Sequence, residues 1–220
     1  MEAQNDNDFW NRAAETKQFS HPLDHARLTR ALPRDAVILD YGCGQGRLSR
    51  ELIDRGYINV LGMDSSIEMI RIASERVPEA GFHAIEGERL PCGDQSIDAV
   101  LLFAVLTCIA SDEAQKKLLR EFKRVLRPGG LLLISDYPLQ ADERNLARYE
   151  EFKDELGGFG RFRLPDGAVL RHHSREWFAT LLGDFRVEEA VEFDGKTMNG
   201  NPARIIQLWA KTTESPRVGG

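Results

Sequence analysis

The sequence predicts an α/β fold in which a mostly parallel β-sheet is covered by helices on both faces. Four short, almost unbroken apolar runs have the length of strands that are buried on both faces. These runs span residues 36–40, 59–63, 96–103 and 131–134. Amphipathic segments with apolar residues at helical spacing alternate with the runs, as they do in strand–helix–strand units. These segments span residues 46–55, 66–76 and 112–126.

Composition and charge restrict the class of protein. The 220 residues suit a single domain, and the net charge of −6 provides no attraction to nucleic-acid phosphates or anionic membranes. The longest apolar run, residues 99–106, is far shorter than the ~20 residues that span a bilayer. The 3 cysteines lack Cys-x-x-Cys spacing, and the acidic N-terminus is unlike a signal peptide. We expect a cytoplasmic protein that binds neither nucleic acid nor membrane.

A glycine-rich turn follows the first predicted strand, which ends at Asp40. Gly42, Gly44 and Gly46 stand at alternate positions before the next helix, and glycines at such a turn let a ligand approach the backbone. The third glycine comes one residue too early for a dinucleotide fingerprint, and Arg47 stands where that fingerprint has glycine. The turn therefore predicts a nucleotide-like ligand other than a dinucleotide.

Four motifs in order resemble those of the class I S-adenosylmethionine (SAM) methyltransferases. The first is Asp-x-Gly-x-Gly-x-Gly, and the others are Asp-Ser-Ser-Ile-Glu-Met, Glu-Arg-Leu-Pro with Ser-Ile-Asp, and Leu-Arg-Pro-Gly-Gly. The resemblance covers residues 36–136. Within the family, the chain is similar to the ubiquinone/menaquinone methyltransferase-like group. It implies a Rossmann-like, seven-stranded, mostly parallel sheet with helices on both faces and a C-terminal antiparallel hairpin at residues 185–193 and 204–210.

The resemblance also suggests how the chain is organised. Residues 1–35 would form an N-terminal helical lid, although Phe9 and Trp10 in it are equally suited to packing in the core. Residues 36–211 would form the methyltransferase domain. Within it, residues 137–173 are the least family-like and are expected to roof the substrate, and residues 212–220 would be a flexible tail.

The family's cofactor is SAM, with S-adenosylhomocysteine as product, and its motifs assign residues to the parts of SAM. Asp40 would face the ammonium group, while Gly42 and Gly44 would let the methionine portion approach the backbone. Asp64, at the end of the second predicted strand, would bond the ribose hydroxyls.

The remaining cofactor contacts lie further along the chain. Ser65 and Met69 would flank the adenosine, and Glu86 and Gly87 would meet the adenine. At this position the chain has glutamate, Glu86, where the family usually has aspartate. Phe103 would line the methionine side, with core packing as its alternative role.

The sequence indicates the catalytic residues less clearly than the cofactor site, because methyl transfer requires mainly that the acceptor be correctly positioned. The aromatic and histidine-rich insertion suggests a small aromatic or heteroaromatic acceptor, methylated on oxygen or nitrogen. A base is needed only if that acceptor is protonated. His172 and Tyr137 are the residues we expect to act, with loop or helix-start packing as the alternative for any histidine.

The same residues bear on several other functions. A nicotinamide-dependent oxidoreductase is disfavoured by Arg47 and by the Pro-Gly-Gly turn at residues 128–130. Amine-directed nucleic-acid methyltransferases carry a Pro-Pro-aromatic motif where this chain has Phe103-Ala104-Val105. The same stretch lacks the acidic cluster of metal-dependent enzymes, so no metal site is expected. A non-catalytic SAM-binding or partner module stays open.

Overall fold

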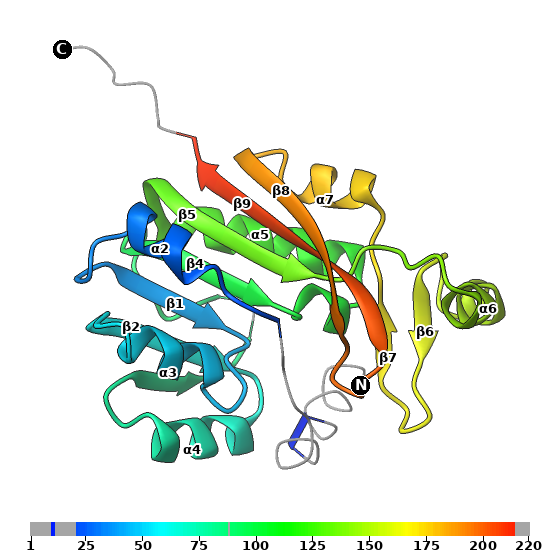
Figure 1. Ribbon diagram of the computed structural model, residues 1–220, viewed down its shortest axis with the longest axis horizontal. Helices are drawn as coiled ribbons and strands as arrows, with labels where there is room; N and C mark the ends of the chain where they lie inside the picture. Colours follow the sequence, from blue (N-terminus) through cyan, green and yellow to red (C-terminus); the bar gives the residue numbers. More distant parts are fainter. Residues whose placement is uncertain (1–9, 12–20, 88, 214–220) are drawn as a thin grey trace.

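The computed structural model describes residues 10–11, 21–87 and 89–213. Within these residues, seven strands form one sheet in the order β3-β2-β1-β4-β5-β9-β8 (Figure 1). The first five pair in parallel, whereas β9 joins β5 and β8 antiparallel. The strands are β1 Val37–Tyr41, β2 Asn59–Asp64, β3 Gly81–Ala84, β4 Ile97–Phe103, β5 Leu126–Asp136, β8 Phe185–Lys196 and β9 Pro202–Thr212. The predicted Rossmann-like sheet with a C-terminal antiparallel hairpin is confirmed.

Helices pack on both faces of this sheet (Figure 1). They are α2 His25–Ala31, α3 Arg47–Ile53, α4 Ile67–Arg76, α5 Asp112–Val125 and α7 Arg175–Leu181. Helix α6 Glu143–Phe152 lies apart from this sheet, within residues 137–173. The core around the sheet is divided into two main clusters, one on each face. Two neighbouring residues of β1 belong to different clusters, because successive side chains of a strand point to opposite faces. Ile38 belongs to the core cluster that contains Leu48 and Leu52 of α3, whereas Leu39 belongs to the cluster that contains Phe122 of α5.

The element ends differ from the prediction mainly at β5. The apolar run predicted a strand over residues 131–134, but β5 begins at Leu126, directly after α5. Leu126 pairs with Ile97, and the register shifts before Leu131 pairs with Ala99. The Pro-Gly-Gly turn is therefore an irregularity inside a longer strand. At the other end of the chain, β9 continues to Thr212, one residue into the expected tail.

Parts of the predicted lid and tail lie outside the described residues, namely residues 1–9, 12–20 and 214–220. Of the lid, Trp10 and Asn11 are described, followed by the segment from His21 onward. The roof, residues 137–173, contains α6 and a small second sheet formed by β6 Arg161–Arg163 and β7 Val169–Arg171. The division into lid, domain and roof stays a prediction.

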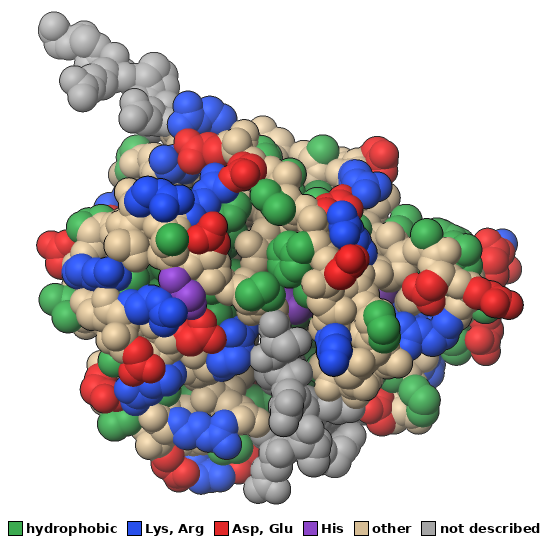
Figure 2. Space-filling model, viewed as in Figure 1, with side chains coloured by type: hydrophobic (Ala, Val, Ile, Leu, Met, Phe, Trp, Pro, Cys, Tyr) green, Lys and Arg blue, Asp and Glu red, His purple; other side chains and the backbone are tan. Residues whose placement is uncertain are grey.

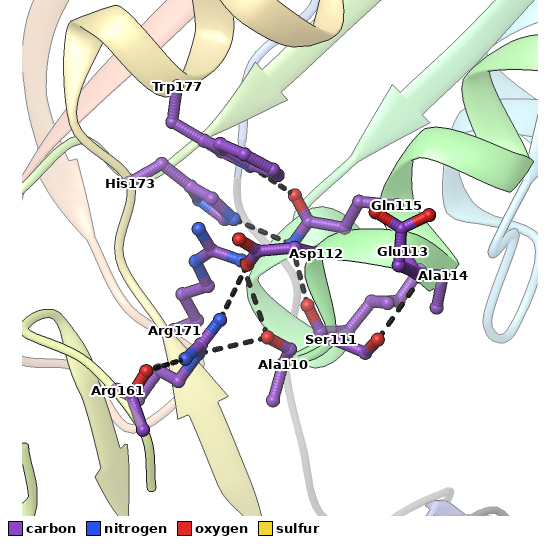
Figure 3. Close-up of polar contacts among 12 residues, drawn as sticks. Ala110, Ser111, Asp112, Glu113, Ala114, Gln115, Arg161, Arg171, His173 and Trp177 are labelled. Carbon is purple, nitrogen blue, oxygen red and sulfur yellow. Dashed lines mark hydrogen bonds and ion pairs between the residues drawn. The ribbon is translucent and has the colours of Figure 1, made fainter. Parts of the chain in front are cut away.

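One carboxylate joins the roof hairpin to α5 (Figure 3). Asp112 accepts hydrogen bonds from Arg161 of β6 and Arg171 of β7, with N–O distances of 2.5 and 2.6 Å. Both guanidinium groups also donate to the carbonyl of Ala110, at 3.0 and 3.3 Å. The two strands of the hairpin are thus held at the same point by opposite charge.

Gln115, one turn further along α5, fixes the end of the hairpin. Its amide nitrogen donates to Nε2 of His173 at 2.8 Å, and its oxygen accepts from the Trp177 indole at 2.7 Å (Figure 3). His173 therefore points toward α5. The preceding residue, His172, instead lines the pocket described below. The two adjacent histidines thus have separate surroundings.

Replacing Asp112 with alanine should loosen the roof. Arg161 and Arg171, whose side chains are 15% and 10% exposed, would both lose their carboxylate. We expect a loss of about 1 to 2 kcal/mol in the free energy of unfolding, measured with urea, because Asp112 itself is partly solvated. Glu113→Ala is the matched control, since exposed Glu113 pairs with Lys116 in the same helix. Equal losses in the two variants would contradict the anchoring role.

Candidate active site

The glycine turn lies at the carboxyl end of β1. Gly42, Gly44 and Gly46 have φ angles of 70°, 52° and 80°, in the left-handed region that side chains disfavour. A Cβ atom at Gly42 would lie 2.3 Å from Cγ2 of Val105, so the turn packs directly against the segment after β4. The N–H of Gly42 donates to the carbonyl of Met63 at 2.7 Å, which joins the turn to β2.

Asp64 holds the glycine turn and the start of α4 together. Its Oδ2 accepts the Gly44 N–H at 3.0 Å, and its Oδ1 accepts the Ser66 N–H at 2.9 Å. Burial raises the pKa of Asp64, and these backbone hydrogen bonds act in the opposite direction. The structure thus brings together two of the predicted cofactor residues, Gly44 and Asp64.

Two further carboxyl groups are buried at the ends of strands. Asp40, which ends the apolar part of β1, accepts from the Ser49 hydroxyl at 2.7 Å, and burial raises its pKa to about 6. Asp136, the last residue of β5, accepts the N–H groups of Tyr137 and Thr107 at 2.8 and 3.2 Å. Burial raises the pKa of Asp136 to about 7. Sequence reasoning found Asp40 by its motif and missed Asp136, which no motif marks.

The start of the chain contacts both the cofactor end and the roof. Trp10 packs against Met69 and Ile72 of α4 and against Ala168 in the roof. The side chain of Asn11 accepts the hydroxyl hydrogen of Ser66, the N-cap of α4, at 2.6 Å. Trp10 therefore lies between α4 at the cofactor end and the roof, and contacts both.

The other predicted cofactor residues lie along the same edge of the sheet. Ser65 is exposed between β2 and α4, and Met69 is buried in the first turn of α4. Glu86 and Gly87 are exposed just after β3. Phe103 is buried at the end of β4 and lines a pocket.

This pocket lies between the glycine turn, the end of β4 and the roof. Its apolar wall is made by Phe103, Phe162, Leu164, Leu170 and Met198. Its basic residues are Arg47, Arg144, Arg148, His21 and His172. A cavity with an apolar wall and a few polar groups is the usual form of a small-molecule site.

Tyr137 and His172, the predicted catalytic residues, meet in this pocket. Their ring centroids are 5.3 Å apart and both side chains are buried. Nδ1 of His172 lies 2.5 Å from the Tyr149 hydroxyl, which also accepts the Gln140 N–H at 3.2 Å. Burial, helped by the charge of Arg148, lowers the pKa of His172 well below its ordinary value. The imidazole is therefore neutral at pH 7, and its catalytic role stays a prediction.

His21 also lines the pocket, and it contacts Ser135, which lies 114 residues away in the sequence. Its Nδ1 is 3.0 Å from the hydroxyl oxygen and 3.2 Å from the carbonyl oxygen of Ser135, and its ring meets Tyr137 edge-on at 4.8 Å. In the tautomer whose Nδ1–H donates to these oxygens, Nε2 holds a lone pair. Within the described part of the chain this buried Nε2 has no hydrogen-bond partner. Burial lowers the pKa of His21 to about 4.

The described residues also bear on metal and membrane binding. They contain no group of three His, Cys, Asp or Glu side chains placed to hold a metal ion. Among their helices, none combines the length and apolar character needed to cross a bilayer. On the face seen in Figure 2, basic and acidic side chains are interspersed.

Comparison with known families agrees with this geometry. A family model described as a methyltransferase domain matches residues 39–134, from β1 to β5. This part of the chain is a class I SAM-dependent methyltransferase domain. Its cofactor is accordingly SAM. The glycine turn and Asp64 both lie within the matched residues, whereas the roof lies beyond them.

Relatives of the methyltransferase domain differ in the acceptors that their names give. Demethylmenaquinone methyltransferase of Renibacterium salmoninarum is 32% identical over 122 residues, which are 52% of this chain and 50% of that protein. The tRNA (carboxymethyluridine(34)-5-O)-methyltransferase of Arabidopsis thaliana is 29% identical over 127 residues, which are 55% of this chain and 29% of that protein. The chain thus spans half or less of these two relatives.

A solved structure supports the fold of nearly the whole chain. The SAM-dependent methyltransferase of Methanosarcina mazei matches 90% of this chain and 100% of its own chain, with a TM-score of 0.82 and 24% identity. The likeness extends past the methyltransferase domain to the roof and the C-terminal hairpin. At this identity it concerns the fold alone.

Asp136→Asn tests whether the buried carboxyl of β5 titrates as its burial predicts. Its pKa rises from 3.8 to about 7 on folding, so the folded protein binds the proton more tightly. The stability that this group contributes is therefore lost as the pH rises from about 4 to about 7. Relative to the wild type, the unfolding free energy of the variant should increase over that range, as measured by urea titrations at several pH values.

The control for this experiment is Asp35→Asn, because Asp35 is exposed. A lost hydrogen bond at Asp136 alone would give a difference that does not change with pH, so a pH-independent offset for Asp136→Asn would contradict the proposed titration.

Proposed function

We propose that the protein transfers the methyl group of SAM to an oxygen or nitrogen atom of a small aromatic or heteroaromatic molecule. The observation that carries this proposal is a single pocket that joins the glycine turn to the roof. Arg47, the first residue after the turn, lines it together with Phe103, Tyr137 and His172. A molecule in this pocket would lie beside a cofactor held at the carboxyl ends of β1 and β2.

The edge of the sheet suits the parts of SAM that we assign to it. Asp40 is a buried carboxyl with a raised pKa, so an ammonium group beside it would stabilise its charged form. The two oxygens of Asp64 accept backbone N–H groups, among them those of Gly44 and Ser66, and a remaining lone pair would accept a ribose hydroxyl. Gly42 and Gly44 present bare backbone to the methionine portion.

The outer contacts of the cofactor follow the same edge. Ser65 and Met69, which border α4, would flank the adenosine. Glu86 and Gly87, which follow β3, would meet the adenine. Both are exposed, so the Glu86 carboxylate is free to turn toward the exocyclic amine.

SAM supplies a methyl group that its positively charged sulfur already activates. The protein then has to hold the acceptor atom about 3 Å from this methyl group, in line with the bond that breaks. The rings of Tyr137 and Phe162 offer flat apolar surfaces to a planar acceptor. In this proposal His172 would bond the acceptor, and a lone pair on His21 Nε2 would accept a hydrogen bond from an acceptor hydroxyl.

The first experiment is equilibrium binding of labelled SAM and of labelled NAD, followed by an acceptor screen that detects S-adenosylhomocysteine. We expect SAM binding, no NAD binding, and product formation with planar small molecules. Binding of NAD in place of SAM would contradict the proposal. SAM binding without product from any small molecule or tRNA would favour a non-catalytic role.

Replacing Asp64 with alanine should weaken SAM binding. The variant loses charge-assisted hydrogen bonds to the ribose and the clamp on Gly44. We expect a loss of roughly 1.5–3 kcal/mol in the free energy of SAM binding, which is an increase of about 10- to 150-fold in the Kd measured by calorimetry. Glu68→Ala is a control in the first turn of α4, where Glu68 pairs with exposed Arg71. Unchanged affinity in Asp64→Ala would remove Asp64 from the proposed site.

Replacing His172 with alanine should lower kcat while leaving SAM affinity nearly unchanged, because His172 lies on the acceptor side of the pocket. Tyr137→Phe, which keeps the ring and removes the hydroxyl, should show the same separation if that hydroxyl contacts the acceptor. Kinetics with an acceptor from the screen would measure both. Unchanged kcat in both variants would leave positioning by the pocket as the mechanism.

A further inference from the structure

The pocket has a charge opposite to that of the protein. The chain carries 35 acidic and 29 basic residues. The residues that line the pocket nevertheless include three arginines, Arg47, Arg144 and Arg148, and no Asp or Glu from the described part of the chain. Arg47 is already paired with Glu51 at 2.7 Å. The excess positive charge thus comes from Arg144 and Arg148, both on α6.

Arg148 is a half-buried cation, and no carboxylate of the described residues lies in ion-pair contact with it. Its Cζ lies 3.4 Å from the centre of the Phe162 ring, so the guanidinium stacks on an aromatic face. Its buried Nε has no hydrogen-bond partner among the residues that the structure describes. Burial, together with the charge of Arg144, lowers the pKa of Arg148. Burying a guanidinium in this way is unfavourable unless something neutralises it.

Arg144 increases the imbalance. It stands four residues before Arg148, so two like charges share one face of α6, which destabilises a helix. Among the residues that the structure describes, it pairs with the carboxylate of Asp142, at an Nε–Oδ1 distance of 3.9 Å. That carboxylate also caps α6, accepting the Asn145 N–H at 3.2 Å. The weak pairing leaves most of the charge of Arg144 available to the pocket.

The second pair of arginines in the roof shows that the protein can neutralise such charges. Arg161 and Arg171 are also partly buried, and they share the carboxylate of Asp112. No equivalent acid faces Arg148 in the described part of the chain. The difference indicates that the charge at α6 is kept for a ligand.

Resting on the proposed function, we infer that the methyl acceptor carries an anionic group, of which a carboxylate is the best fit. A planar guanidinium binds a carboxylate through two parallel hydrogen bonds, and Arg144 can contribute a second charge. Phe162, Leu164 and Leu170 would cover the apolar body of the acceptor. Since α6 lies at the far side of the roof from β1 and β4 (Figure 1), the anion would be held away from the atom that is methylated.

The test uses pairs of probes that differ only in this charge. 4-Hydroxybenzoic, 4-hydroxycinnamic and 5-hydroxyindole-3-acetic acids are compared with their carboxamides. Binding is measured by calorimetry with the full chain saturated with S-adenosylhomocysteine, so no turnover is required. We expect at least one acid to bind at least about tenfold more tightly than its amide. Arg148→Met, which keeps a long side chain over Phe162, should remove most of this preference.

Further variants separate charge from packing. Arg148→Lys should retain part of the preference for acids, and Arg144→Gln should reduce it without touching the Phe162 stack. Arg163→Gln is the matched control, because Arg163 belongs to the same roof, pairs with exposed Glu155 and does not line the pocket. If Arg148→Met does not fold, Arg144→Gln still decides the question.

The outcomes distinguish this inference from the proposed function. Failure of S-adenosylhomocysteine and SAM to bind at all would contradict the proposed function. If S-adenosylhomocysteine binds but no acid in the panel is preferred over its amide, the inference is overturned and the proposed function is not. This holds whether both probes of a pair bind or neither does. A preference that survives in both Arg148→Met and Arg144→Gln would also overturn it.

Discussion

The left-handed turn after β1 is the constraint on which the cofactor end of the molecule depends. Gly42 packs so closely on Val105 that any side chain there would collide with the segment after β4. The same turn donates to the Met63 carbonyl and to the Asp64 carboxylate. Three neighbouring strands of the sheet therefore end at fixed positions relative to one another, which gives an extended ligand a preformed edge to lie on.

The roof adds polar anchors to the apolar packing that also holds the sheet below it. The sheet is stabilised by two apolar clusters, one on each face, and the hairpin packs Phe162 and Leu170 in a smaller cluster with Tyr149. The hairpin is also held by the shared carboxylate of Asp112 and by the amide of Gln115. Polar anchors with defined geometry place a few side chains accurately, and here they turn His173 away while His172 faces the pocket. A purely apolar contact would fix that orientation less strictly.

Local patterns in the sequence were sufficient for the sheet and for the cofactor edge. Apolar runs predicted the strands because both faces of a parallel sheet are buried, and the spacing of Gly42, Gly44 and Asp64 was typical of one family. The acceptor side was different. His21 reaches the pocket through Ser135, 114 residues away, and no local pattern reports such a contact. Arg148 looked like one of many charges on an amphipathic helix, because its burial depends on Phe162 of another element. The irregularity in β5 was missed because Pro-Gly-Gly is also a typical chain reversal.

Strand β8 forms one edge of the sheet and is mostly exposed. An exposed edge of 12 residues offers free backbone groups to any other extended chain, which makes it a site for unwanted association. Here the edge carries Glu188, Glu189, Glu192 and Asp194, each paired with a basic residue of the same chain. A second strand would have to strip water from these charges in order to dock. The ion pairs along β8 thus protect the protein against edge-to-edge aggregation.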